Sequence, residues 1–183
     1  MPSTLFKRVL LLGLVACLTA CTTTSTMTSK AALDSNAKWA ILPLENHTDT
    51  PQSALSAEAI AEHVLRARGV TSIAHYPTTL SRDSLFEPTE RRTVDEAKKW
   101  AREQGIQYGL TGAVEEWRYK VGIDGEPAAA VTLQLLDLET GQVLWSASGA
   151  RSGWSRDSLA GVALRLIDDL LANVRLDPKI ATR

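Results

Sequence analysis

Residues 106–121 read IQYGLTGAVEEWRYKV, and the hydrophobic pattern of this stretch changes phase once. Up to Val114 the apolar residues occupy even positions, whereas from Trp117 onward they occupy odd positions. Because the side chains of a strand alternate between two faces, an unbroken strand would turn one of these two sets away from the core. The pattern predicts a β-bulge near residues 115–116, or an extension past the sheet whose apolar face meets something other than the core.

Two further strands follow this one. A turn over 122–127 leads into an apolar stretch, 128–138, that predicts a returning strand. The sequence Glu139-Thr140-Gly141 then predicts a tight hairpin into a third strand over 142–148. Three successive strands joined by short turns form an antiparallel meander. Gly109-Leu110-Thr111-Gly112 lies inside the first of them, where the glycines are expected to allow close packing.

Two strand–helix units precede the meander, and one helix follows it. We expect strands over 39–44 and 70–76, and helices that run from Thr50-Pro51 to Gly69, from a Thr93–Glu96 capping box to about Gln104, and from near Ser155 onward. The order β-α-β-α-β-β-β-α predicts an α+β (α/β) fold: a mixed sheet with an antiparallel meander and helices packed against it.

The N-terminus has the layout of a lipoprotein signal peptide. Lys7-Arg8 precedes an apolar run too short to cross a bilayer, and Leu18-Thr-Ala-Cys21 resembles a bacterial lipobox. Leu14-Val-Ala-Cys17 also fits, but Cys21 leaves a longer apolar core and is followed by a polar stretch. The predicted organisation is a signal peptide at 1–20, the lipidated Cys21 with a flexible tether at 21–38, and a single periplasmic domain at 39–183.

The residue after the lipidated cysteine indicates the membrane. In lipoproteins of this kind an Asp at that position is the usual signal for retention in the inner membrane, and here it is Thr22. We therefore expect the periplasmic face of the outer membrane. The domain has no further cysteine and must fold without disulfides, and the only attached group expected is the covalent lipid on Cys21.

Charge and motifs exclude several classes of function. The chain has 20 basic and 21 acidic residues, and without residues 1–20 the net charge is −3, which argues against nucleic-acid binding. His47, His63 and His75 lack metal-ligand spacing, and no nucleophile elbow, Walker loop or dinucleotide motif is present. The acidic pairs 115–116 and 168–169 diverge rather than converge. We expect neither a metal nor an enzyme.

The tryptophans and one acidic turn are the candidate functional residues. Trp154 lies in a small polar loop, where we expect it to be exposed and to contact a membrane interface. For Trp117, a core position, a subunit interface and the membrane all stay open. The turn that holds Asp124 and Glu126 would give a negative field if it were repeated around an axis. The remaining tryptophans are expected in the core: Trp39, Trp100 and Trp145.

Four stretches carry a resemblance to a known family: WAILPLEN at 39–46, YGLTGAVEEWRY at 108–119, LDLETGQVLW at 136–145 and ARSGWS at 150–155. Together they resemble the PelC family of outer-membrane lipoproteins, which serve the export of Pel exopolysaccharide. The likeness covers nearly all of residues 39–175. The hairpin pattern alone is also similar to the TolB N-terminal domain, CsgG and LpoB.

The resemblance implies a non-catalytic homo-oligomer, a ring for which a dodecamer is one candidate size. Such a ring would lie under the outer membrane and pass a cationic polysaccharide to the PelB porin for the biofilm matrix. On this chain the resemblance places Trp154 and Trp117 in a membrane-facing aromatic belt and Asp124 and Glu126 in an acidic funnel. A simple meander puts these two sites at the same end of the sheet, so the slipped strand or subunit tilt would have to separate them.

Two other functions compete with this one. An LpoB-like module that regulates a cell-wall synthase would be a monomer on a long tether, and the 17 residues 22–38 span at most about 60 Å. A CsgG-like channel would need an additional membrane-spanning hairpin, and the sequence offers no strand pair beyond the meander.

Overall fold

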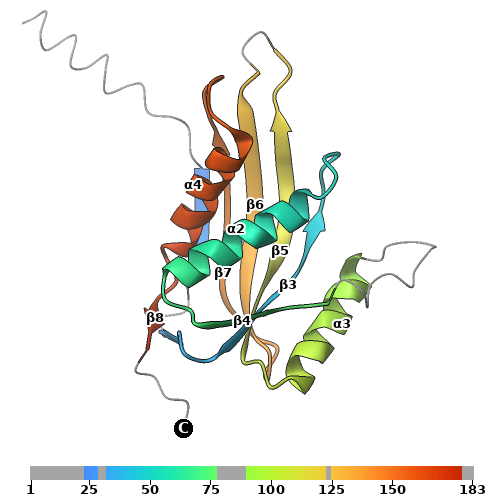
Figure 1. Cartoon of the computed structure of the whole chain (residues 1–183), viewed down its shortest axis with the longest axis vertical. Helices are drawn as coiled ribbons and strands as arrows, with labels where there is room; N and C mark the ends of the chain where they lie inside the picture. Colours follow the sequence, from blue (N-terminus) through green and yellow to red (C-terminus); the bar gives the residue numbers. More distant parts are fainter. Residues whose placement is uncertain (1–22, 29–31, 78–89, 123–124, 179–183) are drawn as a thin grey trace, which may run out of the picture.

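A computed structural model of the chain describes residues 23–28, 32–77, 90–122 and 125–178 (Figure 1). The strands are β1 (Thr23–Thr28), β2 (Leu33–Asp34), β3 (Lys38–Asn46), β4 (Ser72–His75), β5 (Tyr108–Tyr119), β6 (Pro127–Asp137), β7 (Val143–Ser152) and β8 (Leu176–Asp177). The helices are α2 (Ser53–Ala67), α3 (Glu90–Glu103) and α4 (Leu159–Leu171).

The main sheet is mixed, in the order β1-β7-β6-β5-β3-β4. Strand β3 runs parallel to both β4 and β5, as the strand–helix units require, and β5, β6 and β7 form the antiparallel meander. β2 and β8 form a separate parallel pair. The predicted fold is confirmed for β3 to α4, and β1, β2 and β8 are additional strands.

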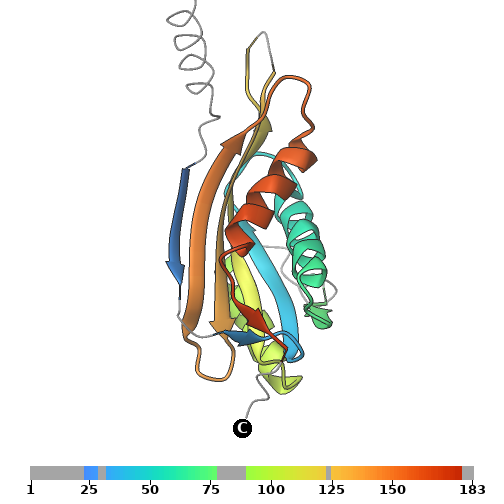
Figure 2. The same cartoon turned by 90° about the vertical axis from the view of Figure 1, so that its left-hand side faces the viewer.

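The two faces of the sheet are covered differently. Figure 2 shows α2 and α4 on the same side of the sheet, where their apolar stripes pack on Trp39, Leu110 and Leu133. α3 packs on a second, smaller cluster, in which Ala97 and Ala101 meet alternate β3 residues such as Leu42. The open part of that second face carries small or polar side chains, such as Thr132 and Ser148.

The predicted β-bulge is present in β5. Val114 lies opposite Val131, and the next paired residue, Glu116, lies opposite Ala130, so Glu115 has no partner of its own on β6. The extra residue returns Trp117 to the face that already holds Val114, and both side chains belong to the core under α2 and α4. One inserted residue in β5 therefore accounts for the change of phase in the hydrophobic pattern.

The close packing expected at the β5 glycines is also present. A Cβ at Gly109 would lie 2.9 Å from the Leu42 side chain, and a Cβ at Gly112 would overlap the carbonyl oxygen of Thr132. Gly112 also has a φ of 150°, which side chains disfavour. Both positions let β5 approach its neighbours at a distance that a larger residue would prevent.

The helices begin elsewhere than predicted. α2 begins at Ser53 rather than at Pro51, because the hydroxyl of Thr50 donates to the Trp117 carbonyl instead of capping the helix. α3 already begins at Glu90, so Thr93 lies within the helix and is not its cap. α4 begins at Leu159, where the Ser158 hydroxyl accepts the Gly161 N–H.

Parts of the tether expected over 21–38 form strands, β1 and β2. Thr23–Thr28 forms strand β1, antiparallel to β7, and Leu33 is buried beside Trp39, whose Nε1 donates to the Asp34 carbonyl at 3.0 Å. A run of Thr and Ser has the composition of a linker. Its backbone nevertheless supplies the hydrogen bonds that β7 would otherwise lack at the sheet edge.

The pairing of β1 can be tested with a disulfide. Residues 22–183 contain no native cysteine, and Ser25 lies directly opposite Ser148. Opposite residues of antiparallel strands are about 4.5–5.5 Å apart, within disulfide range. We expect Ser25→Cys with Ser148→Cys to form an intramolecular disulfide on mild oxidation, seen as a mobility shift. Ser25→Cys with Ser152→Cys, about 13 Å out of register, is the control and should not form it. Equal yields from the two pairs would contradict the register.

Candidate functional site

The β5–β6 turn and the loop between β7 and α4 lie side by side at one end of the sheet (Figure 1). The Lys120 N–H donates to the Glu126 carbonyl at 2.7 Å, and the Gly153 N–H donates to the Pro127 carbonyl at 2.8 Å. The Lys120 ammonium reaches the Ser152 hydroxyl at 2.7 Å. The first hydrogen bond closes the turn, and the other two hold the turn and the loop together as one surface.

Large apolar side chains are exposed on this surface. Trp154 is 69% exposed, Tyr119 is 53% exposed and Val121 is fully exposed. We call these three residues the apolar tip. Of these three residues, the sequence predicted exposure only for Trp154. The apolar residues at odd positions continue past the end of the sheet to Val121, and this pattern could have indicated that Tyr119 and Val121 are exposed as well.

The local backbone turns Trp154 outward. A Cβ at Gly153 would lie 2.5 Å from Val162 of α4, so only a glycine lets the loop approach the helix this closely. Asp157 then fixes the turn, because its carboxylate accepts the Trp154 N–H at 2.9 Å while its own N–H donates to the Trp154 carbonyl at 2.8 Å. The exposure predicted for Trp154 is confirmed.

Trp117 does not belong to this surface. It is only 6% exposed and packs in the core under α2 and α4. The assignment of Trp117 to a membrane-facing belt is therefore wrong for the protomer, because the bulge at Glu115 turns its ring inward. Trp39 and Trp145 are buried as expected, and Trp100 is half-buried against Tyr76, with ring centroids 5.7 Å apart.

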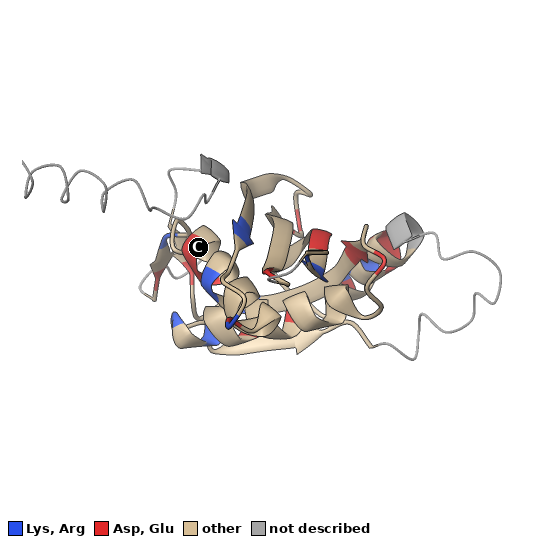
Figure 3. Ribbon diagram, turned by 90° about the horizontal axis from the view of Figure 1, so that it is seen from above, with Lys and Arg blue, Asp and Glu red and all other residues tan. Residues whose placement is uncertain are grey.

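The acidic turn lies at the same end as Trp154. Glu126 is partly exposed and shares the β5–β6 turn with Val121, whereas Asp124 lies outside the described residues. The bulge in β5 does not move this turn to the other end of the sheet. Seen from above, acidic and basic residues are interspersed over the elements (Figure 3).

The two candidate lipidation sites, Cys17 and Cys21, also lie outside the described residues. The register of β1 nevertheless fixes the position of the chain just after them. Thr23 lies opposite Ala150, four residues before Trp154, whereas Thr28 lies opposite Trp145, further from the tip. The strand therefore enters the sheet at the end that carries the apolar tip.

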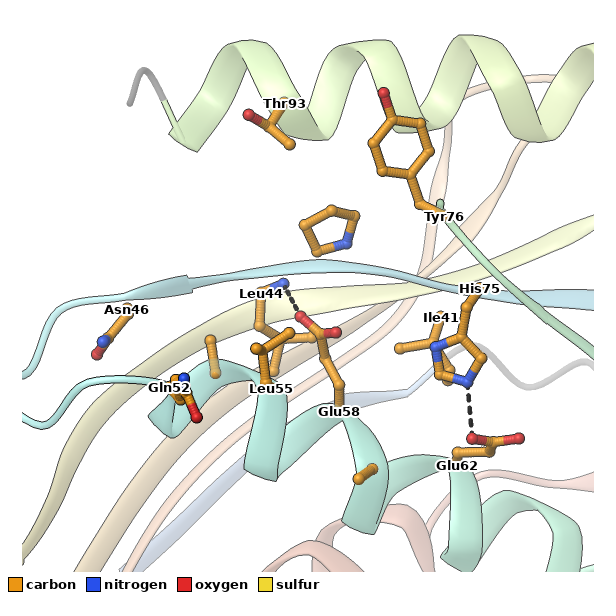
Figure 4. Close-up of a pocket in the computed structure, with 13 residues that line it drawn as sticks. Ile41, Leu44, Asn46, Gln52, Leu55, Glu58, Glu62, His75, Tyr76 and Thr93 are labelled. Atoms are coloured by element: carbon orange, nitrogen blue, oxygen red, sulfur yellow. Dashed lines mark hydrogen bonds and ion pairs between the residues drawn. The ribbon is translucent and has the colours of Figure 1, made fainter. Parts of the chain in front are cut away.

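A groove of about 480 Å³ lies between α2, α3, β3 and β4 (Figure 4). Glu58 reaches across it and accepts the Leu44 N–H at 2.9 Å, where the β3–β5 register shifts. Burial raises the pKa of Glu58, and this hydrogen bond partly opposes that effect. His75 and Glu62 pair at 2.7 Å nearby. These contacts fasten α2 to the sheet.

In the described part of the chain, His, Cys, Asp and Glu form no group of three or more that could hold a metal ion. None of its helices has both the length and the apolar character needed to span a bilayer.

The different environments of Trp117 and Trp154 lead to a prediction. Trp117→Ala removes a buried ring and should lower the free energy of unfolding by about 3–5 kcal/mol. Trp154→Ala removes an exposed ring and should change it by less than about 0.5 kcal/mol. Urea denaturation followed by circular dichroism measures both. A Trp154 variant as unstable as the Trp117 variant would show that the loop tryptophan packs on the domain.

One family model and several solved structures match this chain. Residues 55–150, more than half of the chain, match the model of the peptidoglycan-synthase activator LpoB. No curated protein matches. A lipoprotein from Neisseria meningitidis is 18% identical and matches 75% of this chain and 97% of its own, with a TM-score of 0.57, which shows a common fold.

Two structures of a PelC dodecamer from Paraburkholderia phytofirmans are much more similar in sequence. One is 39% identical over 86% of this chain and 99% of its own, with a TM-score of 0.73. The other is 40% identical over 84% of this chain and 98% of its own, with a TM-score of 0.70. The match to the LpoB model covers more than half of the chain, and the PelC identity extends over nearly the whole relative, so the chain belongs to the LpoB family and is a member of the PelC family.

Proposed function

We propose that this chain is a non-catalytic lipoprotein of the outer membrane, attached through Cys21, whose copies form a ring that guides a cationic exopolysaccharide toward an outer-membrane porin. The similarity to PelC dodecamers supports the ring and the link to Pel export. The observation that carries the proposal is the position of β1, because it brings the predicted lipid to the apolar tip.

The distance between lipid and tip is short along the chain. Cys21 precedes Thr23 by two residues, which span at most about 7 Å, and Thr23 lies opposite Ala150 at the tip end of β7. A lipid at this position would hold the apolar tip against the membrane. The domain would then lie close to the bilayer rather than at the end of a long tether.

The chemistry of the tip suits a membrane interface. Trp and Tyr rings favour the headgroup region, where an apolar ring and a polar atom can both be satisfied, and exposed Val121 can enter the acyl boundary. The basic side chains of Lys120 and Arg156 lie on the same turn and loop, where anionic headgroups would attract them.

The acidic turn keeps a role in this arrangement. Because Glu126 lies at the tip end, repetition of the turn around a ring would place Asp124 and Glu126 at the membrane-side mouth. A negative mouth would attract a cationic polymer where it leaves the ring for the porin, which we propose to be PelB.

An LpoB-like regulator of a cell-wall synthase is the second candidate, and the match to the LpoB model favours it. Such a regulator must reach through the cell wall. The residues expected to provide that reach are partly taken up by β1 and β2, so the structure favours a domain held at the membrane.

The ring can be tested by the mass of residues 22–183 in solution. We expect native mass spectrometry or analytical ultracentrifugation to show a closed oligomer, with about twelve copies as in the related PelC dodecamers. A monomer at high concentration, both in solution and on lipid vesicles, would overturn the ring and favour the regulator.

The tip can be tested by polymer export in cells. Trp154→Ala combined with Val121→Ser should leave the amount and the oligomeric state of the protein unchanged, because both side chains are exposed. We expect secreted polymer to fall at least about tenfold, as the loss of interfacial contacts in every subunit adds up. Val143→Ser, an exposed residue at the opposite end of β7, is the matched control and should secrete normally. Normal secretion by the tip variant would refute the membrane role of the tip.

A further inference from the structure

His47 lies between two carboxylates from different strands, just after the end of β3. Its Nδ1 is 3.0 Å from the Glu115 carboxylate of β5, and its Nε2 is 3.1 Å from the Glu45 carboxylate of β3. All three side chains are partly exposed, so solvent protons reach them. Glu115 is the bulge residue without its own partner on β6, which leaves its side chain free to turn toward His47.

Only a protonated ring satisfies both contacts. A neutral imidazole donates through one nitrogen and presents a lone pair at the other, which would face a carboxylate oxygen. The hydrogen bond to Glu115, followed by the one to Glu45, raises the pKa of His47, and burial opposes this only in part. The imidazolium therefore holds the pair of carboxylates together.

The basic groups around the cluster have contacts of their own. Lys98 of α3 lines the hollow beside Glu45 and Glu115 and pairs with Asp95 at 3.4 Å. On the other side, Arg118 pairs with Glu116 at 2.9 Å. Asp49, from the loop that follows His47, adds a further negative charge to that side.

The backbone links the same two strands at the same place. The His47 N–H donates to the Val114 carbonyl at 2.9 Å, immediately before the bulge. Thr50 holds the following turn of the loop through the Trp117 carbonyl, at 2.5 Å. The His47 ring thus lies where the loop between β3 and α2 is fastened to β5.

We infer that His47, Glu45 and Glu115 form a pH-sensitive clamp that, when protonated, fastens the loop after β3 to the β5 bulge and masks two surface carboxylates. Loss of the proton changes the charge of the cluster from −1 to −2 and leaves two carboxylates facing solvent. A polycation would then meet a more negative surface. The inference goes beyond the proposed function, since it requires neither a ring nor a particular polymer.

The direction of the pH dependence follows from the raised pKa. The folded state holds the proton more tightly than the unfolded state, whose histidine titrates near the ordinary value of 6.5. The stabilisation by the clamp is complete below pH 6.5 and is lost as the pH rises through the folded pKa, which lies above 6.5.

The experiment uses the full chain, expressed with its leader and purified in detergent, and compares wild type with His47→Gln. The Tm difference between them should be positive at about pH 5.5 and should vanish by about pH 8.5. N-acetylated hexalysine, whose side chains all stay charged over this range, is the probe for the exposed carboxylates. Its affinity for wild type should rise about threefold more than its affinity for His47→Gln over the same interval, as expected for one charge about 6 Å away in water.

Two further variants complete the test. Glu115→Gln removes the contact that raises the pKa of His47 most, so the Tm difference between Glu115→Gln and the same protein with His47→Gln added should depend on pH less than the difference between wild type and His47→Gln. His63→Gln removes an exposed histidine of α2 and should behave as wild type does in both measurements. A Tm difference for His47→Gln that is the same at every pH would overturn the clamp, as would a hexalysine affinity with the same pH dependence in wild type and His47→Gln.

Discussion

The inserted residue in β5 is the constraint on which the rest of the structure depends. Without it, the side chains after Val114 would continue on the wrong faces, and Trp117 would leave the core. With it, Trp117 fills the space under α2 and α4, and its carbonyl accepts the Thr50 hydroxyl. The same insertion leaves Glu115 free to meet His47. One local irregularity therefore packs a large ring, positions a loop and creates a charged cluster.

Beyond the bulge, β5 extends past the part of the sheet that α2 and α4 cover. Tyr119 ends the strand with its ring half-exposed, although its hydroxyl accepts the Leu159 N–H at the start of α4. The hydrogen bond thus fixes Tyr119 to the start of α4, while no described helix covers the apolar tip. An apolar surface that is held this firmly, yet left uncovered, is typical of a site of contact with a partner or a membrane.

Strand β1 bears on how a protomer would be oriented in a ring of the PelC type. Membership of the PelC group suggests a ring, but it does not by itself say which end of a protomer faces the membrane. On the proposed lipidation of Cys21, the pairing of Thr23 with Ala150 would provide that orientation, since the chain enters the sheet at the tip. A lipid two residues earlier and the exposed Trp154 would then act on the same bilayer. Such an arrangement would distinguish a membrane-held ring from a regulator on a long tether.

Much of this protein is determined by local sequence. The apolar run of β3, the alternation in the meander, the hairpin at Glu139-Thr140-Gly141, the glycines of β5 and the bulge itself all follow from patterns within about ten residues. The exposure of Trp154 follows in the same way, from the small polar loop around it. Strand and helix periodicity report which residues share a face, and that is enough to predict the fold class.

Only the tertiary structure decided which elements meet. Thr23–Thr28 has the composition of a linker, and it is a strand because β7 offers an unpaired edge. His47 and Glu115 are 68 residues apart, and no local pattern relates them. Whether Trp117 faces the core, a subunit interface or the membrane depends on the helices that pack over it. Periodicity is a property of one segment, whereas burial and charge pairing depend on the segment that lies opposite, and that partner is fixed only when the chain folds.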